Sequence, residues 1–305
     1  MVLHHPLTYR RRLAGITVLV GCGAGDPPPR SVEFIEPVIF ESKGYLQAPG
    51  LTESSGVAAS RRHSGLLWTH NDSGDDAVLY LTNLDGEDLG KLTLEGAQAR
   101  DWEDLSLGPC PDEDGDCLYI ADTGDNDQVR SRARIYVVRE PTVIPLAERA
   151  SSEARRINLY YPDRSFNIEA IATSPSGDLW MISKGLADTA IFTFKITRSE
   201  LTKDTIEVRP LGRLDFDPEP VLGQLVTAAA ISVDGQTLVA RTYTQIFFYE
   251  IDGDRLERLG LCWLGRQEPQ GEAVDFMDGD LLVLTSESET GGRAPISIVS
   301  CQRRS

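Results

Sequence analysis

The stretch EAIATSPSGDLWMIS, from Glu169 to Ser183, contains an acidic residue, a short apolar run, a turn and a second apolar run. Short apolar runs broken by Pro, Gly, Ser and Asp are typical of β-strands joined by tight turns. The same phrase starts at five places along the chain: Ser55–Ala58, Glu103–Ser106, Glu169–Ala172, Ala229–Ser232 and Glu272–Asp275. The sequence therefore predicts an internal repeat of short strands.

Each copy of the repeat continues with further predicted strands. Second strands are expected at Leu66–His70, Leu118–Asp122, Leu179–Ser183, Thr237–Arg241 and Leu281–Thr285. Third strands are expected at Val78–Asn83, Arg134–Val138, Ile191–Ile196, Ile246–Ile251 and Ile296–Ser300. Fourth strands are expected near Gly90–Leu94, Arg155–Tyr161, Val208–Leu214 and Arg255–Cys262. Successive copies begin about 43 to 66 residues apart, which is the size of a four-stranded propeller blade.

These repeats predict an all-β protein folded as a β-propeller of four-stranded blades. We expect five blades, with a sixth, degenerate blade as the alternative, and a β-sandwich pair ranks well below either. The fifth copy ends without a fourth strand, so we expect Phe34–Phe40 to supply it. Closure by an N-terminal strand leaves no open sheet edge. The best helical candidate is Ile144–Arg156.

The N-terminus carries the pattern of an export signal. Arg10, Arg11 and Arg12 precede an apolar run that ends before Cys22, and a run this short does not span a bilayer, which needs about 20 residues. Leu19-Val20-Gly21-Cys22 resembles a lipobox, which implies cleavage before Cys22 and lipidation of its thiol. A plain secretion signal is the alternative. We therefore divide the chain into a signal peptide (1–21), a tether (22–31) and one propeller domain (32–305), placed at the bacterial cell envelope, lipid-anchored or secreted.

The charge of the chain restricts its partners. The 305 residues have a net charge of −17; the signal segment contains three Arg and no acid, so the remainder has 27 basic and 47 acidic residues, a net charge of −20. Nucleic acids and anionic membrane surfaces require basic patches. We therefore expect no nucleic-acid partner, membrane contact only through the lipid anchor, and a monomer that binds a small molecule or an envelope protein.

Four cysteines remain after Cys22, and an even number in an exported protein favours disulfides. Three connectivities are open. Cys110 and Cys117 flank the hairpin-like loop Pro111–Asp116, so this pair is expected first, and Cys262 with Cys301 follows by elimination. Four free buried thiols are the alternative.

Acidic residues recur at matched positions of the repeat. Glu103, Glu169 and Glu272 begin three copies, beside Ser55 and Ala229 in the other two. First strands line the channel of a propeller, so we expect these side chains to face one another. The alternative is that they are ordinary solvated residues at strand starts.

A second set of acids follows the second strands. His70-Asn71-Asp72-Ser73-Gly74-Asp75 matches Asp122-Thr123-Gly124-Asp125-Asn126, which makes Asp72 and Asp122 equivalent; two tight turns are the alternative. Converging carboxylates repel unless a cation neutralises them, and Ca²⁺ accepts this mixture of oxygens, whereas Zn²⁺ requires more His and Cys. Candidate Ca²⁺ ligands are Glu103, Glu169, Glu272, Asp72 and Asp122. Alternative sources of positive charge are Arg130, Arg132, Lys184 and Arg241.

Several phrases of the chain resemble known propellers. Trp68–Asp75, Asp101-Trp102-Glu103-Asp104 and Ala121–Asn126 resemble a group of uncharacterised secreted bacterial β-propeller proteins. Asn167-Ile168-Glu169-Ala170-Ile171-Ala172 is similar to the phrase of phytase-like esterase and SdiA-regulated propellers. The resemblance implies a calcium-binding propeller. The chain departs from the pattern at Ala229, where a Glu is expected.

Two functions are compatible with these features. The first is a surface-tethered calcium-binding propeller that binds a ligand or partner without catalysis, because the sequence contains no Gly-x-Ser-x-Gly motif. The alternative is a calcium-dependent hydrolase of phosphoesters or lactones. In that enzyme, Glu103 or Glu169 would serve as base, and His70 or Lys184 as acid or charge stabiliser.

Overall fold

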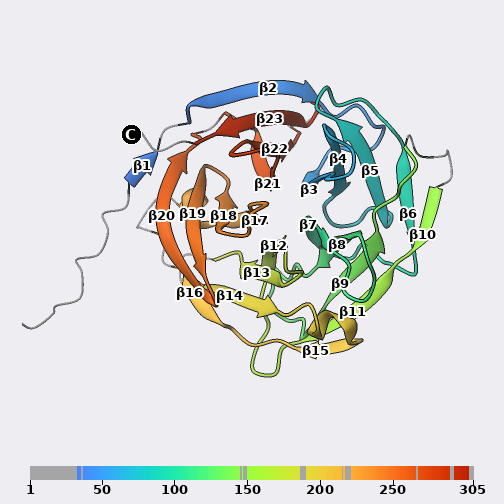
Figure 1. Ribbon diagram of the computed structural model, residues 1–305, viewed down its shortest axis with the longest axis vertical. Helices are drawn as coiled ribbons and strands as arrows, with labels where there is room; N and C mark the ends of the chain where they lie inside the picture. The colour runs from blue at the N-terminus through green and yellow to red at the C-terminus, as the bar shows by residue number, and fades with distance from the viewer. Residues whose placement is uncertain are drawn as a thin grey trace, which may run out of the picture. The chain divides into compact units, whose positions relative to one another are not determined.

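The predicted repeats fold into five β-sheets arranged around a central axis, which makes the chain a five-bladed β-propeller (Figure 1). The computed structural model describes residues 33–35, 37–144, 146, 150–185, 190–214, 216, 221–265, 267–288 and 292–301. The expected signal peptide, the lipidation site at Cys22 and the tether at 22–31 lie outside these residues.

Four strands form the body of each blade. Blade 1 consists of β3 (Ser54–Ala59), β4 (Leu66–Asn71), β5 (Val78–Asn83) and β6 (Lys91–Glu95). Blade 2 consists of β7 (Trp102–Pro109), β8 (Asp116–Asp122), β9 (Arg132–Arg139) and β11 (Arg155–Tyr160). Blade 3 consists of β12 (Ile168–Thr173), β13 (Leu179–Ser183), β14 (Ile191–Ile196) and β16 (Gly212–Leu214). Blade 4 consists of β17 (Val226–Ile231), β18 (Thr237–Thr242), β19 (Gln245–Asp252) and β20 (Arg255–Trp263).

An N-terminal strand completes blade 5, as the sequence predicts. The blade contains β21 (Gln270–Phe276), β22 (Leu282–Glu287) and β23 (Pro295–Ser300), and β2 (Ile39–Tyr45) pairs antiparallel with β23 at its outer edge. The position differs from the predicted strand Phe34–Phe40. Its first part instead forms β1 (Glu33–Ile35), which pairs in parallel with β20 of blade 4.

Two further short strands extend the outer edges of blades 1 and 2. β10 (Ala150–Glu153) pairs in parallel with β6, and β15 (Thr205–Glu207) pairs in parallel with β11. The helix expected over Ile144–Arg156 is therefore wrong, since its described part contains β10 and the start of β11. Pairing with neighbouring strands outweighs the weak local preference of this segment. Among the described residues the helical turns are two short 3₁₀ segments, Glu200–Thr202 and Val221–Gln224, and no helix there is long and apolar enough to cross a membrane.

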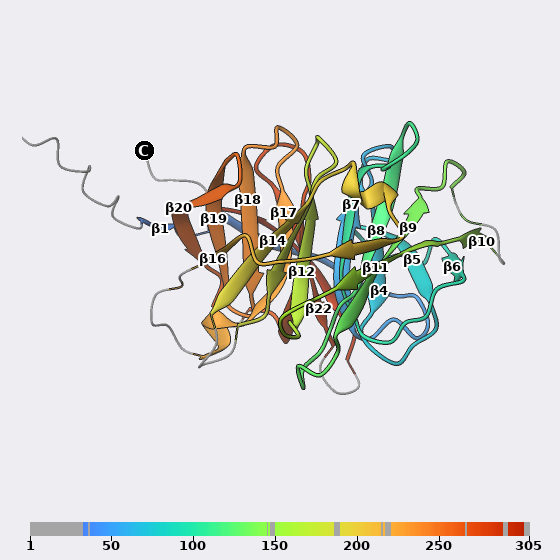
Figure 2. The same cartoon turned by 90° about the horizontal axis from the view of Figure 1, so that it is seen from below.

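The hydrophobic core consists of five clusters, one between each pair of neighbouring blades. Alternate residues of one strand point into different clusters: Trp68 packs between blades 1 and 2, whereas Leu67 packs between blades 1 and 5. Because the blades are covered on both faces, their strands are apolar almost throughout, as in Leu179–Ile182. The strands run between the two faces of the ring (Figure 2).

Two disulfides confirm the pairing expected from the sequence. Cys110 is bonded to Cys117, with 4.9 Å between their Cα atoms, and closes the loop between β7 and β8. Cys262 is bonded to Cys301, 6.0 Å apart, and connects the last strand of blade 4 to the residue after β23. Disulfides of this kind are consistent with an extracytoplasmic protein.

Candidate functional site

A β-bulge interrupts the start of the innermost strand in every blade. The register shifts occur between Ser54 and Gly56, Trp102 and Leu105, Ile168 and Ala170, Val226 and Ala228, and Gly271 and Ala273. A bulge leaves one residue unpaired and re-aims its side chain. These five bulges therefore form a repeated structural feature at one mouth of the channel.

The bulges also correct the alignment of the repeats. In each blade, one residue comes immediately before the point where regular pairing resumes after the bulge. In blades 1 to 5 these residues are Ser55, Asp104, Glu169, Thr227 and Glu272. Thr227 thus occupies the position that the sequence pattern assigned to Ala229. Asp104 occupies the position assigned to Glu103, which lies in the same bulge. The apolar pattern of the sequence does not reveal the extra residue of a bulge. The sequence alignment of the repeats is therefore shifted in blades 2 and 4.

A second ring of equivalent residues follows the second strands. After each bulge, the first residue of the innermost strand that pairs again has a partner on the second strand. The residues two positions after these partners are Asp72, Asp122, Lys184, Tyr243 and Glu287. By this count Asp72 and Asp122 share a position, whereas on the mouth side of the bulge Asp122 is paired with Trp102 and Asp72 follows the last paired residue, Asn71. Tyr243 and Glu287 lie at the same distance beyond their predicted second strands, which is a signal in the sequence, although neither belongs to a predicted motif.

Three carboxylates from blades 1 and 2 gather at this mouth. One oxygen from each of Asp72, Asp101 and Glu103 lies within 4.8 Å of the other two. Burial raises the pKa of Glu103 well above its usual range, and the charges of Glu169, Asp72 and Asp101 raise it further. Burial and then the charge of Asp72 also raise the pKa of Asp101. In the part of the chain that the structure describes, no Lys or Arg forms an ion pair with these three acids.

Gly124 allows the close approach of these acids. A Cβ atom at this position would overlap the Glu103 carboxylate and meet the Asp101 carboxyl group at 2.5 Å. Gly124 belongs to the loop after β8, so the loop from blade 2 closes over its own innermost strand. Asp101 was noted in the sequence beside Glu103 but was not among the predicted ligands.

Glu169 of blade 3 has a cationic partner. Its Oε2 lies 2.8 Å from Lys184 Nζ, and its Oε1 accepts a hydrogen bond from Asn167 Nδ2 at 2.6 Å. Burial by itself lowers the pKa of Lys184, but the charge and hydrogen bond of Glu169 together with the charges of Tyr243 and Glu103 outweigh it, and the pKa is raised overall. Lys184 therefore supplies positive charge at this mouth.

Glu272 of blade 5 is buried beside an amide rather than a cation. Gln270 Nε2 donates a hydrogen bond to Glu272 Oε1 at 2.8 Å. Burial raises the pKa of Glu272 to about 8, and the charges of Glu287 and Glu169 contribute in the same direction. Burial, followed by the charges of Asp72 and Glu53, also raises the pKa of Glu287. The mouth is acidic across blades 1, 2, 3 and 5.

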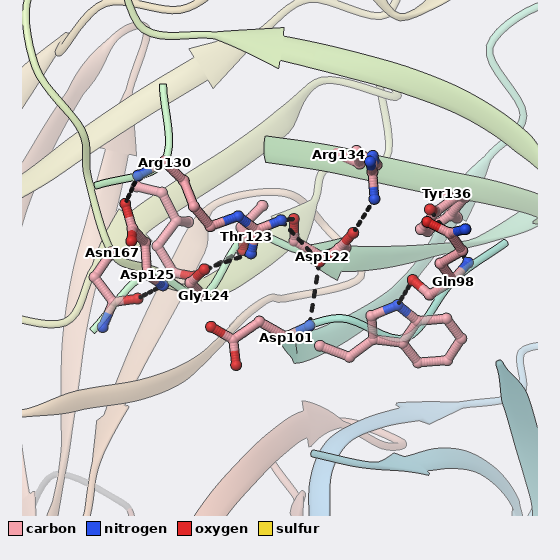
Figure 3. Close-up of polar contacts among 12 residues, drawn as sticks. Gln98, Asp101, Asp122, Thr123, Gly124, Asp125, Arg130, Arg134, Tyr136 and Asn167 are labelled. Atoms are coloured by element: carbon pink, nitrogen blue, oxygen red, sulfur yellow. Dashed lines mark hydrogen bonds and ion pairs between the residues drawn. The ribbon is translucent and has the colours of Figure 1, made fainter. Parts of the chain in front are cut away.

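Asp122 is held by two arginines and lies outside the group of three carboxylates. Arg130 Nη2 lies 3.0 Å from Asp122 Oδ1, and Arg134 Nη1 lies 3.2 Å from Oδ2 (Figure 3). The backbone amide of Asp101 also donates to Asp122 Oδ1, at 3.2 Å. The carboxylate is fully buried. Asp122 thus anchors the loop that holds Asp101, a positioning contact rather than a contact with a ligand.

His70 lies in the interface between blades 1 and 2. Its ring is completely buried and packs edge-on against Trp102, and Nδ1 is hydrogen-bonded to the carbonyl of Asn71 at 2.7 Å. Burial lowers the pKa of His70. The structure therefore encloses His70 in the core, where the charge of Asp72 and the backbone of Asp104 still act on its ring.

The side chain of Asp104 extends from blade 2 to the innermost strands of blades 3 and 4. Its carboxylate accepts backbone hydrogen bonds from Leu105 at 2.8 Å, Ile171 at 2.9 Å and Ala229 at 3.3 Å, which belong to three different blades. Burial raises its pKa well above the usual range. Asp104 therefore ties the innermost strands of blades 2, 3 and 4 together.

Comparisons with known proteins support the fold alone. No protein-family model matches the chain, and no curated protein matches it. Among solved structures, the chain is similar to the PQQ-bound form of aldose sugar dehydrogenase from Streptomyces coelicolor, with a TM-score of 0.51 and 13% identity. The match covers 87% of this chain and 98% of that chain. It supports the β-propeller class; the expected link to phytase-like esterase or SdiA-regulated propellers finds no counterpart in these comparisons.

Proposed function

We propose that this protein is a surface-tethered, calcium-binding β-propeller that binds a small molecule or an envelope protein at the acidic mouth. The observation that carries the proposal is the convergence of Asp72, Asp101 and Glu103, whose oxygens lie within 4.8 Å of one another. The tether rests on the lipobox pattern that ends at Cys22.

The donor set fits a hard cation. Ca²⁺–oxygen distances are roughly 2.3–2.6 Å, so two oxygens on one ion lie at most about 5 Å apart. The three acids meet this limit. Burial and neighbouring charges raise the pKa of Asp101 and of Glu103, and a bound cation would relieve both costs. Neither His63 nor His70 belongs to the group, which disfavours Zn²⁺.

Calorimetric titration of Ca²⁺ into chelator-treated protein tests the proposal. We expect saturable binding that raises the melting temperature and weakens at least tenfold in Glu103→Gln. Glu113→Gln is the matched control, because Glu113 is an exposed acid in the disulfide-closed loop, where it pairs with Arg139. Absence of Ca²⁺ binding to the native protein, or equal weakening by both variants, would refute the calcium site.

A calcium-dependent hydrolase of phosphoesters or lactones is the second candidate, and the contact between Lys184 and Glu169 favours it. Bound Ca²⁺ would supply an acidified water and polarise the substrate oxygen. Glu103 or Glu169 would accept the proton of the attacking water, and Lys184 would stabilise developing negative charge. His70 is buried in the blade interface, so Lys184 is the better placed of the two predicted acids.

Turnover separates the two candidates. A panel of phosphoesters and lactones should be assayed with added Ca²⁺, for the native protein and Glu169→Gln. Turnover that disappears in the variant while the fold is retained establishes the hydrolase. No turnover by a protein that binds Ca²⁺ supports the binding module.

A further inference from the structure

A cavity lies at the end of the channel opposite the acidic mouth. Its volume is about 260 Å³, and it is lined by residues at the ends of β3 and β21, by Ile231 at the end of β17 and by Val233 after that strand. These innermost strands begin at the acidic mouth with their bulges and finish here. The cavity therefore belongs to blades 1, 4 and 5 and shares no residue with the acidic mouth.

Three charged side chains line this cavity: Arg61, Asp275 and the exposed Asp278. Arg61 and Asp275 carry opposite charges but do not pair with each other. Both residues belong to the described part of the chain, and no ion pair within 4 Å joins them there. Arg61 Nη2 instead donates to the carbonyl of Leu107 in blade 2 at 3.1 Å. The remaining guanidinium donors stay available to a molecule in the cavity.

The carboxylate of Asp275 is held in place by backbone amides. Its Oδ2 accepts from the amide of Ala59 at 2.8 Å and its Oδ1 from the amide of Phe276 at 2.8 Å. Burial raises the pKa of Asp275 to about 6. Removal of water from a carboxylate is costly unless a partner compensates it, and the neighbouring Arg61 compensates it only at a distance.

The remaining wall combines apolar side chains with the hydroxyl-bearing residues Ser60 and Ser64. Ile231, Phe276 and Met277 line the cavity, and Val233 at its rim is 64% exposed. Small-molecule sites combine apolar walls with a few polar groups that fix the orientation of the ligand. This cavity of about 260 Å³ combines apolar side chains with the polar groups of Arg61 and Asp275.

We propose that the cavity binds a small zwitterion with an apolar side chain, that is, an α-amino acid such as leucine. The guanidinium of Arg61 pairs with the carboxylate of the ligand. Asp275 accepts the ammonium group, and the apolar side chain packs against Phe276, Met277 and Val233. A simple amine would leave Arg61 without a partner and a simple carboxylate would leave Asp275 without one, so a molecule with both charges fits best.

Calorimetry with L-leucine tests this site. Isopentylamine lacks the carboxylate, 4-methylpentanoate lacks the ammonium group, and glycine lacks the apolar side chain. We expect leucine to bind at least tenfold more tightly than each of the three. Failure of leucine to bind, or equal binding of isopentylamine or 4-methylpentanoate, overturns the proposal.

Variants locate the binding. Arg61→Gln should weaken leucine binding at least tenfold, whereas Arg62→Gln, at the exposed neighbour that does not line the cavity, should not change it. Because Asp275→Asn also disturbs the contacts to Ala59 and Phe276, Val233→Trp provides an independent block at the exposed rim. Leucine binding that survives both Arg61→Gln and Val233→Trp overturns the assignment to this cavity. Glu103→Gln should leave leucine binding intact, which separates this site from the calcium site.

Discussion

The loop after β4 and the loop after β8 have the same Asp-Ser/Thr-Gly-Asp sequence and opposite surroundings. Asp72 in the first loop lies with Asp101 and Glu103 and has no cationic side chain paired with it among the described residues. Asp122 in the second loop is fully buried between Arg130 and Arg134. The first carboxylate of the motif is therefore available to a cation in blade 1, whereas in blade 2 it is already paired with arginine side chains.

The difference comes from residues that follow the motif. Asp125 accepts the backbone amides of Val129 and Arg130, which turns the loop so that Arg130 reaches Asp122. The equivalent Asp75 accepts from the side chains of Asn71 and Tyr80 instead. A motif of turn residues thus sets the position of the carboxylate, whereas Arg130 in the following loop and Arg134 in the next strand decide whether that carboxylate is neutralised.

Replacement of Arg130 by Met should have the largest effect. Removing one partner of a buried ion pair leaves an uncompensated charge, and we expect a loss of about 3–5 kcal/mol in the free energy of unfolding. Urea denaturation measures this loss. Arg132→Met is the matched control, because Arg132 is exposed, and it should change stability by less than about 0.5 kcal/mol. Equal losses in the two variants would show that the ion pair between Arg130 and Asp122 does not stabilise the fold.

Asp72→Asn should weaken Ca²⁺ binding without lowering the stability of the calcium-free protein. We expect Ca²⁺ affinity to fall at least tenfold, which is about 1.4 kcal/mol, while the unfolding midpoint in chelator stays unchanged or rises slightly. Asp122→Asn should show the reverse pattern, a lower midpoint with Ca²⁺ binding weakened less. Calorimetry and urea denaturation on both variants check the contrast. A lower midpoint for Asp72→Asn in chelator would contradict it.

Glu272 extends the comparison to an acid whose partner is an amide. Its pKa is about 8 in the folded protein, against an ordinary value of 4.5, so the folded state binds this proton more tightly than the unfolded state. Its contribution to stability is complete below about pH 4.5 and is lost as the pH rises through about 8. In chelator, the free energy of unfolding should therefore decrease over this interval, and less steeply in Glu272→Gln. An unchanged slope in the variant would exclude Glu272 as a source of the pH dependence.

Gly74→Ala should have the smallest effect. Gly74 has a φ angle of +86° and open space around the position of a Cβ, so alanine costs only backbone strain, about 1 kcal/mol. Urea denaturation should show this loss, and calorimetry should show unchanged Ca²⁺ affinity. A loss of Ca²⁺ binding would mean that the backbone of the loop, rather than the carboxylates, holds the cation.

Much of the fold could be predicted because each blade repeats a local pattern. Apolar strands such as Leu179–Ser183 and the turns between them identify themselves by composition, and the loop between Cys110 and Cys117 indicates its own disulfide. The errors arose where pairing partners decide. Ile144–Arg156 was expected to be helical, but its described part pairs with strands β6 and β9. Likewise, Phe34 lies in a strand on blade 4 rather than on blade 5.

The candidate site was predictable only as a set of residue types at one mouth. The pattern identified Glu103, Glu169, Glu272 and Asp72, but not the grouping of Asp101 with Asp72 and Glu103. It also offered no means of separating Asp122 from Asp72. That separation depends on Arg130 in the following loop and on Arg134, which is paired opposite Asp122 on the next strand.

The sequence by itself determined the five repeats and the recurrence of acids at their starts, because these are local and periodic properties. Only the tertiary structure decided which acids meet, which are neutralised and which tie blades together. Asp104 receives the amides of Ile171 and Ala229, 67 and 125 residues further along the chain. Contacts between residues so far apart in the sequence depend on closure of the ring and on the bulge in each innermost strand. Neither feature can be recognised from local composition.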